Sequence, residues 1–238
     1  KNRPESIGII IEILMINEYV IRKATKKDIP FLADVVIAAE KGNSDKLSYS
    51  TLFNLSENKV KDLIIAMFEE EVDGCELSLS SFLVTEYHGE PVAACGAWIE
   101  GFDGGMPSKI LKSNLISYTF GKESIEFLKT KAYIIEDILA EREPMALQLE
   151  YLHVSHNHLG KRLDAELIQK HEENAMSIYP ALEKAQGLLF KSNVFSVKLF
   201  MKQGYKIVKS FKSSNNEIGN YLPFNEKVLI EKHFKEIT

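Results

Sequence analysis

The chain has 238 residues, with 29 Lys and Arg side chains against 34 Asp and Glu side chains, so its formal net charge is −5. This length suggests one large domain or two small ones, and 45% hydrophobic residues suffice for a sizeable core. The acidic balance argues against a nucleic-acid binder, because phosphate neutralisation requires a clustered excess of cations. Two cysteines, Cys75 and Cys95, without metal-ligand spacing exclude a disulfide framework or a zinc finger and favour a reducing cytoplasm.

The N-terminal segment resembles a weak signal peptide. A basic start at residues 1–3 precedes an apolar run at 7–16, but Glu12 interrupts this run and no small-residue cleavage site follows. The run is also too short to span a bilayer. We therefore expect a soluble, cytoplasmic protein, and we interpret residues 1–14 as an extension outside the fold, because Met15 begins a more conventional opening.

The first hundred residues predict a strand, two helices and a hairpin. Residues 19–24 have the polar alternation of a short strand. Thr25, with Asp28 three residues later, predicts a capping box for a helix that ends near Gly42, and Ser56 predicts the cap of a second helix. The remaining segments are a polar loop at 43–55, apolar strands at 81–87 and 92–100, and a turn at 88–91 between them.

The rest of the chain alternates helices and strands. Three glycines interrupt the pattern at 101–106, and residues 108–143 are predicted to be helical. Later strands are expected at 146–155, 187–190, 205–211 and 227–233, and helices at about 160–176 and 193–203. No repeat or clear linker is present, so we expect one α/β domain over residues 15–238, with a helical insertion at about 101–145 between the third and fourth strands.

The segment at 147–163 predicts an anion site. A strand runs through a tight turn directly into a helix, and the N–H groups at a helix start have no partner within the helix. Together with the helix dipole, such groups suit a phosphate. Gly160 allows close approach of the backbone, and Lys161 and Arg162 add positive charge. From these residues alone, a purely structural turn is an equal alternative.

A second segment adds a family pattern. An Asn is followed by a small residue, an aliphatic–aromatic pair and then Gly-Tyr, at positions Asn193, Ser196, Leu199, Phe200, Gly204 and Tyr205. This segment resembles the final motif of the GNAT N-acetyltransferase superfamily, and residues 157–162 resemble the acyl-CoA-binding motif of the same family. The order of elements from 19 to 233 is also similar, so the resemblance covers most of the chain. It implies an α/β (α+β) domain with a mixed, mostly antiparallel central sheet flanked by helices.

The resemblance also implies how acetyl-CoA would bind. Two central strands, at 149–155 and 187–190, splay apart, and the pantetheine arm lies between them, bonded to the backbone like an added strand. A backbone N–H of the first strand polarises the thioester carbonyl, an effect worth ~3 kcal/mol. The expected cofactor-binding residues are Leu152, Val154, Asn157, His158, Leu159, Gly160, Lys161, Arg162, Asn193 and Phe200.

Three residues depart from the family pattern. Asn157 stands where Gln or Arg is usual, and Arg162 replaces a small residue, although the central Gly160 is kept. Phe200 stands where many members carry a Tyr that protonates the departing CoA thiolate. Phe has no proton to give, so a water or another residue serves instead, or the thiolate leaves unprotonated, as its pKa near ~8.5 allows.

The fourth-strand segment holds two candidates for the catalytic base that an attacking amine requires. Glu150 lies near the position where family members tend to carry a carboxylate base, and burial would raise its pKa toward the operating pH. His153 titrates near neutrality unaided. Their odd separation places the two side chains on opposite faces of the sheet. The alternatives are a solvated or salt-bridged Glu and a packed His.

Three histidines close together in the sequence are candidate metal ligands, but we expect no metal. His153, His156 and His158 have no acidic or Cys ligand at a fixed spacing, so we interpret them as polar residues around the entrance to a cofactor site.

The insertion and the loop at 41–56 are expected to form walls of the acceptor pocket. The alternative is that the insertion packs outside or forms a dimer contact.

We therefore expect an acetyltransferase that moves the acetyl group of acetyl-CoA to a primary amine of a small molecule. The alternatives are a protein or peptide N-acetyltransferase, an acyl-CoA-binding module without turnover, and a structural protein on the same scaffold. Phe200 and the altered glycine motif motivate the binding module. The expected partner is a small-molecule amine, without nucleic acid or membrane, and a homodimer is an open possibility.

Overall fold

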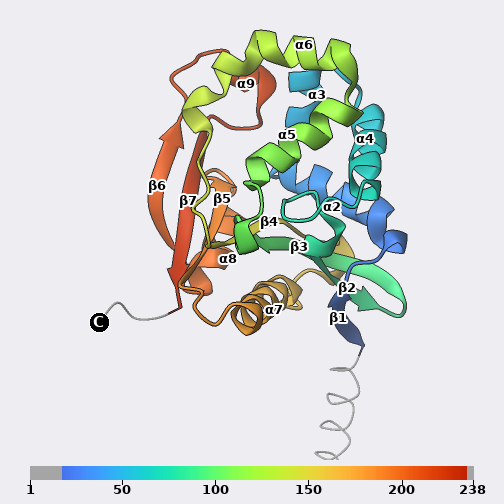
Figure 1. The fold of residues 1–238 in the computed structure, drawn as a ribbon, viewed down its shortest axis with the longest axis vertical. Coiled ribbons are helices and arrows are strands. Elements are labelled where there is room, and N and C mark those ends of the chain that lie inside the picture. Colours follow the sequence, from blue (N-terminus) through green and yellow to red (C-terminus); the bar gives the residue numbers. More distant parts are fainter. Residues whose placement is uncertain (1–17, 235–238) are drawn as a thin grey trace, which may run out of the picture.

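The computed structural model describes residues 18–234, and the predicted extension at 1–14 lies outside these described residues. Within them, seven strands form one sheet in the order β1-β2-β3-β4-β5-β7-β6 (Figure 1). β4 and β5 are parallel, and the other neighbouring strands of the described sheet are antiparallel. The strands are β1 (Tyr19–Lys23), β2 (Phe82–Tyr87), β3 (Glu90–Ile99), β4 (Leu147–Val154), β5 (Lys184–Phe190), β6 (Lys206–Lys212) and β7 (Glu226–His233). The predicted mixed, mostly antiparallel sheet is confirmed.

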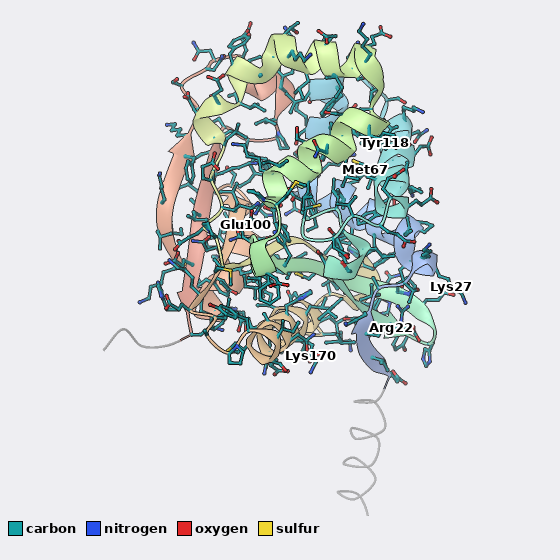
Figure 2. All side chains as sticks on the ribbon, in the orientation of Figure 1. Arg22, Lys27, Met67, Glu100, Tyr118 and Lys170 are labelled. Atoms are coloured by element: carbon teal, nitrogen blue, oxygen red, sulfur yellow. The ribbon has the colours of Figure 1, made fainter. Side chains whose placement is uncertain are left out.

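Helices cover both faces of this sheet, with two hydrophobic cores between the layers. The larger core joins α2–α5 to one face, and the smaller core joins α7 and α8 to the other. Met67 is fully buried in the larger core, whereas Lys170 lies on the outer side of α7 (Figure 2). The helices are α2 (Ile29–Lys41), α3 (Ser48–Phe53), α4 (Glu57–Glu69), α5 (Ser108–Thr119), α6 (Gly121–Lys131), α7 (Leu163–Ile178), α8 (Val194–Lys202) and α9 (Ile218–Tyr221).

Local capping explains where the first long helices begin and end. The Thr25 N–H donates to Asp28 Oδ2 at 2.7 Å in a capping box ahead of α2. Gly42 adopts a left-handed φ of 54° and ends α2, because this conformation suits glycine. Ser56 Oγ accepts a hydrogen bond from the Lys59 N–H at the start of α4. These predicted helix boundaries are confirmed.

Three sequence predictions about elements are wrong. The expected loop at 43–55 contains α3, which forms because Phe53 packs on Phe120 of the insertion, with ring centroids 4.5 Å apart. The predicted helix at 108–143 ends at Lys131 and continues as the 3₁₀ turns Ala132–Ile134 and Glu136–Ile138. α7 begins at Leu163 rather than near 160, since the left-handed φ values of Gly160 (77°) and Arg162 (63°) do not fit a helix.

A β-bulge interrupts the pairing of β3 with β4. Gly96 pairs with Glu150 and Ala94 pairs with His153, so a single β3 residue, Cys95, lies opposite two β4 residues. Tyr151, within the bulge, has a left-handed φ of 54°. The extra residue bends the strand and shifts the alternation of its side chains by one position.

The bulge overturns the predicted orientation of the two candidate bases. Leu149 before the bulge and Leu152 after it both pack on the α7 side, although their separation is odd. Tyr151 enters the core on the α2 side. Glu150 and His153 therefore lie on the same, α2-facing side of the sheet, and the prediction of opposite faces is wrong.

The buried His171 of α7 binds the strand residue opposite the bulge. Its Nε2–H donates to the Cys95 carbonyl at 2.8 Å, and the residue is 7% exposed. Burial lowers the pKa of His171 to about 4, although the bond to Cys95 acts in the other direction. The neutral imidazole is therefore part of the folded structure.

We predict that His171 makes the protein less stable at mildly acidic pH. Below pH ~6.5 the unfolded chain binds a proton that the folded chain excludes, so the free energy of unfolding falls by ~1.4 kcal/mol per pH unit until the folded pKa is reached. Urea unfolding at pH 7.5 and pH 5 measures this slope. His171→Gln should flatten it, whereas the exposed His156→Gln should not. Equal slopes in both variants would contradict the prediction.

Candidate active site

β4 and β5 separate beyond the short stretch over which they pair. Their parallel pairing runs from Leu147 with Ala185 to Leu149 with Gly187 and ends there. Beyond this point β4 still pairs with β3, and β5 still pairs with β7 as far as Phe190. Each strand therefore keeps one paired edge and turns one unpaired edge toward the gap. The predicted splay of these two strands is confirmed.

A cavity of about 100 Å³ lies in the gap between the two strands. The helices α2 and α8 and the strand β7 complete its wall. Of the residues expected at the site, Glu150, Leu152, Asn193 and Phe200 line it, and His153 does not. The full lining is Ala39, Glu40, Leu149, Glu150, Tyr151, Leu152, Leu188, Leu189, Phe190, Asn193, Ser196, Phe200 and Lys227.

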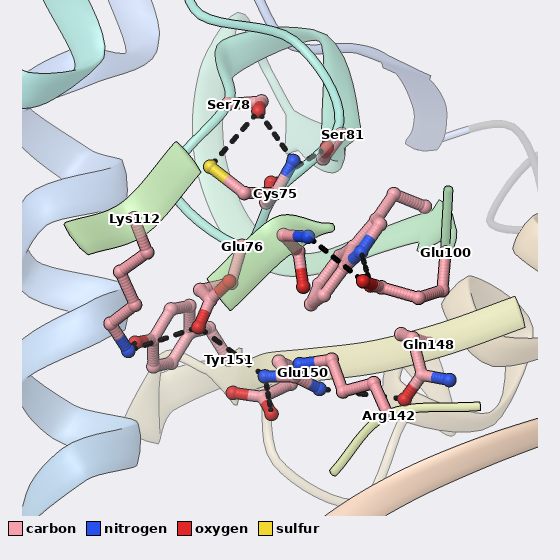
Figure 3. A network of polar contacts seen from close by, with 12 residues as sticks. Cys75, Glu76, Ser78, Ser81, Glu100, Lys112, Arg142, Gln148, Glu150 and Tyr151 are labelled. Atoms are coloured by element: carbon pink, nitrogen blue, oxygen red, sulfur yellow. Dashed lines mark hydrogen bonds and ion pairs between the residues drawn. The ribbon is translucent and has the colours of Figure 1, made fainter. Parts of the chain in front are cut away.

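Glu150 is held at the cavity by an arginine from the insertion. Arg142 Nη2 lies 2.6 Å from Glu150 Oε1 and 3.3 Å from Glu76 Oε1 (Figure 3). Its guanidinium lies 4.7 Å from the centre of the Trp98 ring. Stacking and ion pairing together fix the direction of this guanidinium. Glu150 Oε2 makes no hydrogen bond to any residue in the described part of the chain. One carboxylate oxygen is thus restrained and the other is available.

A second ion pair shares Glu76 with Arg142. Lys112 of α5 approaches Glu76 Oε1 at 2.9 Å, and Glu76 is 3% exposed (Figure 3). Burial would raise the pKa of Glu76, but Lys112 and Arg142 outweigh it and hold this pKa at about 2. The insertion therefore contributes Lys112 and Arg142 to the support of the site, while no residue of 101–145 lines the cavity itself.

Glu40 is the second carboxylate of the cavity, and nothing in the sequence pattern singled it out. Ser48 Oγ donates to Glu40 Oε2 at 2.9 Å, and the Tyr151 hydroxyl donates to Glu40 Oε1 at 3.3 Å. Burial raises the pKa of Tyr151 well above its ordinary value, which keeps this hydroxyl protonated. The bulge brings Tyr151 to this side of the sheet, so its role could not be read from strand alternation.

His153 lies on the α2 face but outside the cavity wall. Burial lowers its pKa, and the charge of Asp34 only partly opposes this effect. His153 is therefore a neutral imidazole near physiological pH. The structure brings Glu150, and not His153, to the gap between the strands.

The turn before α7 presents free backbone N–H groups. The Leu159 N–H donates a hydrogen bond to the His156 carbonyl. The next backbone N–H along the chain with an acceptor is that of Ala165, which donates to the Asp164 carboxylate. For the N–H groups of residues 160–164, no acceptor is found between residues 18 and 234. Gly160 has nothing within 4 Å of the position that a Cβ would take, so the surface above this turn is open.

Of the other residues expected to bind the cofactor, some line the cavity and others lie in or near the turn before α7. Asn193 caps α8, with Oδ1 accepting from the Ser196 N–H at 3.2 Å. Phe200 is 2% exposed and packs edge-to-face on Tyr205, with ring centroids 5.1 Å apart. His158 Nδ1 lies 3.0 Å from the Tyr19 hydroxyl, which ties the turn to β1. Asn157, Lys161 and Arg162 lie around the exposed turn, and Val154 packs on the α7 side.

The described part of the chain has neither a candidate metal cluster nor a candidate membrane-spanning helix. Between residues 18 and 234, no three or more His, Cys, Asp or Glu side chains cluster in a way that could hold a metal ion. No helix in this part of the chain is long and apolar enough to cross a membrane.

We predict that Arg142 contributes strongly to stability. Arg142→Met would leave Glu150 unpaired and deprive buried Glu76 of one of its two cations, at a cost of roughly 3 kcal/mol in the free energy of unfolding. Lys109→Met provides the control, because Lys109 and Glu141 form a pair of 68% and 83% exposed side chains, which is worth less than ~1 kcal/mol. Urea unfolding would contradict the prediction if both variants lost the same stability.

Comparison with known proteins supports the fold. No protein-family model matches the chain, and no curated protein matches it in sequence. Among solved structures, an N-acetyltransferase from Staphylococcus aureus Mu50 is 15% identical, with a TM-score of 0.56 over 89% of this chain and 99% of that chain. The Salmonella typhimurium protein yncA, with its cofactor acetyl-CoA, is 15% identical, with a TM-score of 0.54 over 92% and 96%.

A third neighbour is a polyamine N-acetyltransferase from Drosophila melanogaster that catalyses the formation of N-acetylagmatine. It is 13% identical, with a TM-score of 0.54 over 91% of this chain and 100% of that chain. At such identities the likeness concerns architecture alone. The splayed parallel pair within a mostly antiparallel sheet, covered by helices on both faces, is the fold of the GNAT acetyltransferases, as the resemblance predicted.

Proposed function

We propose that this protein is an acetyl-CoA-dependent N-acetyltransferase that acetylates a primary amine of a small molecule. The observation that carries the proposal is the pair of unpaired strand edges, on β4 after Leu149 and on β5 after Gly187, on either side of a cavity. Buried backbone groups without partners are costly, so such edges favour a ligand that hydrogen-bonds like a strand. The two amide groups of a pantetheine arm have this chemistry.

The turn before α7 supports binding of the phosphates of CoA. The N–H groups of residues 160–164 have no acceptor among the described residues and lie at the start of a long helix, where the dipole favours an anion. Lys161 and Arg162 are both exposed beside them. The chain therefore offers a site for the pyrophosphate next to a site for the pantetheine arm.

Glu150 is the group that we assign to deprotonate the acceptor amine. An ammonium is not a nucleophile, so the amine must lose a proton before or during attack on the thioester. Arg142 restrains Glu150 Oε1, and Oε2 remains to accept that proton. We assign His153 no proton transfer, because it does not line the cavity. Glu40 of α2, which also lines the cavity, is a second carboxylate that favours a cationic acceptor.

The charge of the cavity and two of the neighbours support a small cationic acceptor. The Drosophila neighbour is a polyamine N-acetyltransferase that forms N-acetylagmatine, and another neighbour, 12% identical with a TM-score of 0.53, is an agmatine N-acetyltransferase. Small cationic amines are therefore the first acceptors to test. An acyl-CoA-binding module without turnover is the second candidate, since Phe200 in the cavity wall has no proton to donate.

We predict micromolar binding of acetyl-CoA that depends on the turn. Gly160→Glu should weaken it at least ~10-fold, because a carboxylate would repel the phosphates and fill the open surface. Gly121→Glu is the matched control, since Gly121 has a similar φ of 74°, against 77° for Gly160, and equally open surroundings. Calorimetric titration of the three proteins measures the effect. No heat of binding to folded wild-type protein would refute the proposed function.

We predict that Glu150→Gln removes turnover without removing binding. The amide keeps an oxygen near Arg142 but cannot accept the proton, so kcat toward agmatine, spermidine or another responsive amine should fall ~10²–10⁴-fold. The affinity for acetyl-CoA, measured by calorimetry, should change little. An unchanged kcat would exclude Glu150 as the base. Acetyl-CoA binding by the wild type without acetyl transfer to any amine tested would favour the binding module.

A further inference from the structure

Lys227 is a cation of the cavity for which the proposed function has so far no role. It lies on β7 directly opposite Phe190 of β5, and its side chain lines the cavity between the splayed strands. The ammonium lies 4.9 Å from the centre of the Phe190 ring, which supports a cation without neutralising it. Among the described residues that line the cavity, Lys227 is the single cation.

The partners of Lys227 differ from those of the other cations near the site. Lys112 and Arg142 have carboxylate oxygens at 2.9 and 2.6 Å. Lys227 has no carboxylate within 4 Å and no hydrogen-bond partner in residues 18–234. The charges around it are Glu40 on α2 and Glu150 on β4, which favour the ammonium, and Lys112 and Arg142, which oppose it. A partly buried ammonium without a partner is a place where an anionic ligand group gains the most.

The proposed reaction produces such an anion in the cavity. When the amine nitrogen attacks the thioester carbon, a C–N bond forms, the C–S bond breaks and its electron pair leaves on sulfur. The acceptor ammonium has first lost one proton through Glu150 to solvent, and the N–H proton released as the amide forms then goes to Glu150, so a thiolate remains to be neutralised. Phe190, Phe200 and the leucines of the wall cannot neutralise it, and the Tyr151 hydroxyl donates to Glu40.

We propose that the Lys227 ammonium pairs with the CoA sulfur and gives it a proton as the thiolate leaves. The step ends with CoA as a thiol, Lys227 as a neutral amine and Glu150 protonated, and proton exchange through solvent restores both residues. This inference rests on the proposed function. It assigns to a residue of β7 the proton transfer that Phe200 of α8 cannot perform.

The electrostatic surroundings suit this role. Burial lowers the pKa of Lys227, and the repulsion of Lys112 and Arg142 acts in the same direction, while Glu40 and Glu150 do not outweigh them. The ammonium is therefore a stronger acid than a lysine in water and closer to the thiol, whose pKa is near ~8.5. A proton passes more readily between groups of matched pKa.

The test compares two ligands and two lysines, and it needs no acceptor. Calorimetry at pH 8.5 gives the affinities for CoA and for desulfo-CoA, which lacks the sulfur. The wild type should bind CoA at least tenfold more tightly, and Lys227→Met should reduce this ratio to near one. Lys227→Arg keeps the charge and should keep most of the ratio. The control is Lys209→Met on exposed β6, because Lys209 lies at the same 4.9 Å from the Phe211 ring but outside the cavity.

The outcomes separate this inference from the function on which it rests. If folded Lys227→Met and wild type bind CoA with the same ratio to desulfo-CoA, Lys227 does not contact the sulfur and the inference is overturned. If Lys227→Met loses the same affinity for CoA and for desulfo-CoA, the inference is overturned as well. If folded wild type binds neither ligand, the proposed function fails and the inference with it. Where Lys227→Met fails to fold, Lys227→Gln takes its place.

Discussion

β4 and β5 pair as parallel strands only as far as Leu149 and Gly187, and beyond this point their facing edges carry backbone groups without a strand partner. Inside a sheet, such edges are normally paired or covered. Here each strand is held by its outer neighbour, β3 or β7, so the gap persists without unravelling the sheet. The cavity, the position of the turn before α7 and the approach of α2 and α8 all depend on this gap. We propose that its occupant is a ligand that can bond two backbone edges.

The bulge at Tyr151 determines which side chains surround the gap. It turns Tyr151 to the α2 side, where Glu150 also lies and where charges of both signs converge from segments far apart in the chain. The insertion supplies Lys112, which pairs with Glu76, and Arg142, which pairs with Glu76 and Glu150, so a residue that does not touch the cavity fixes the direction of a carboxylate that does. Among the described residues, Lys112 and Arg142 each have a carboxylate partner and Lys227 has none, and we propose that the partner of Lys227 comes from a ligand.

Much of the architecture could be predicted from the sequence because short segments, such as helix caps and motifs, determine it locally. Thr25, Gly42 and Ser56 mark helix ends by their own chemistry, and the Asn193 motif and the turn around Gly160 correctly indicated the fold. The bulge could not be predicted, since residues 149–152 read as ordinary strand and the extra residue exists only in pairing with β3. Glu40 and Lys227 come from α2 and β7, and only the folded sheet brings them together. α3 was missed because its burial depends on Phe120, far along the chain.

The central claim is that the gap between β4 and β5 is the binding site for the pantetheine arm of acetyl-CoA. A crystal structure of the protein with acetyl-CoA tests it most directly. The account predicts that the arm lies between the two strands and hydrogen-bonds their unpaired edges, with the pyrophosphate on the N–H groups of residues 160–164. Acetyl-CoA bound elsewhere on the protein, or β4 and β5 paired along their full length in the complex, would contradict it.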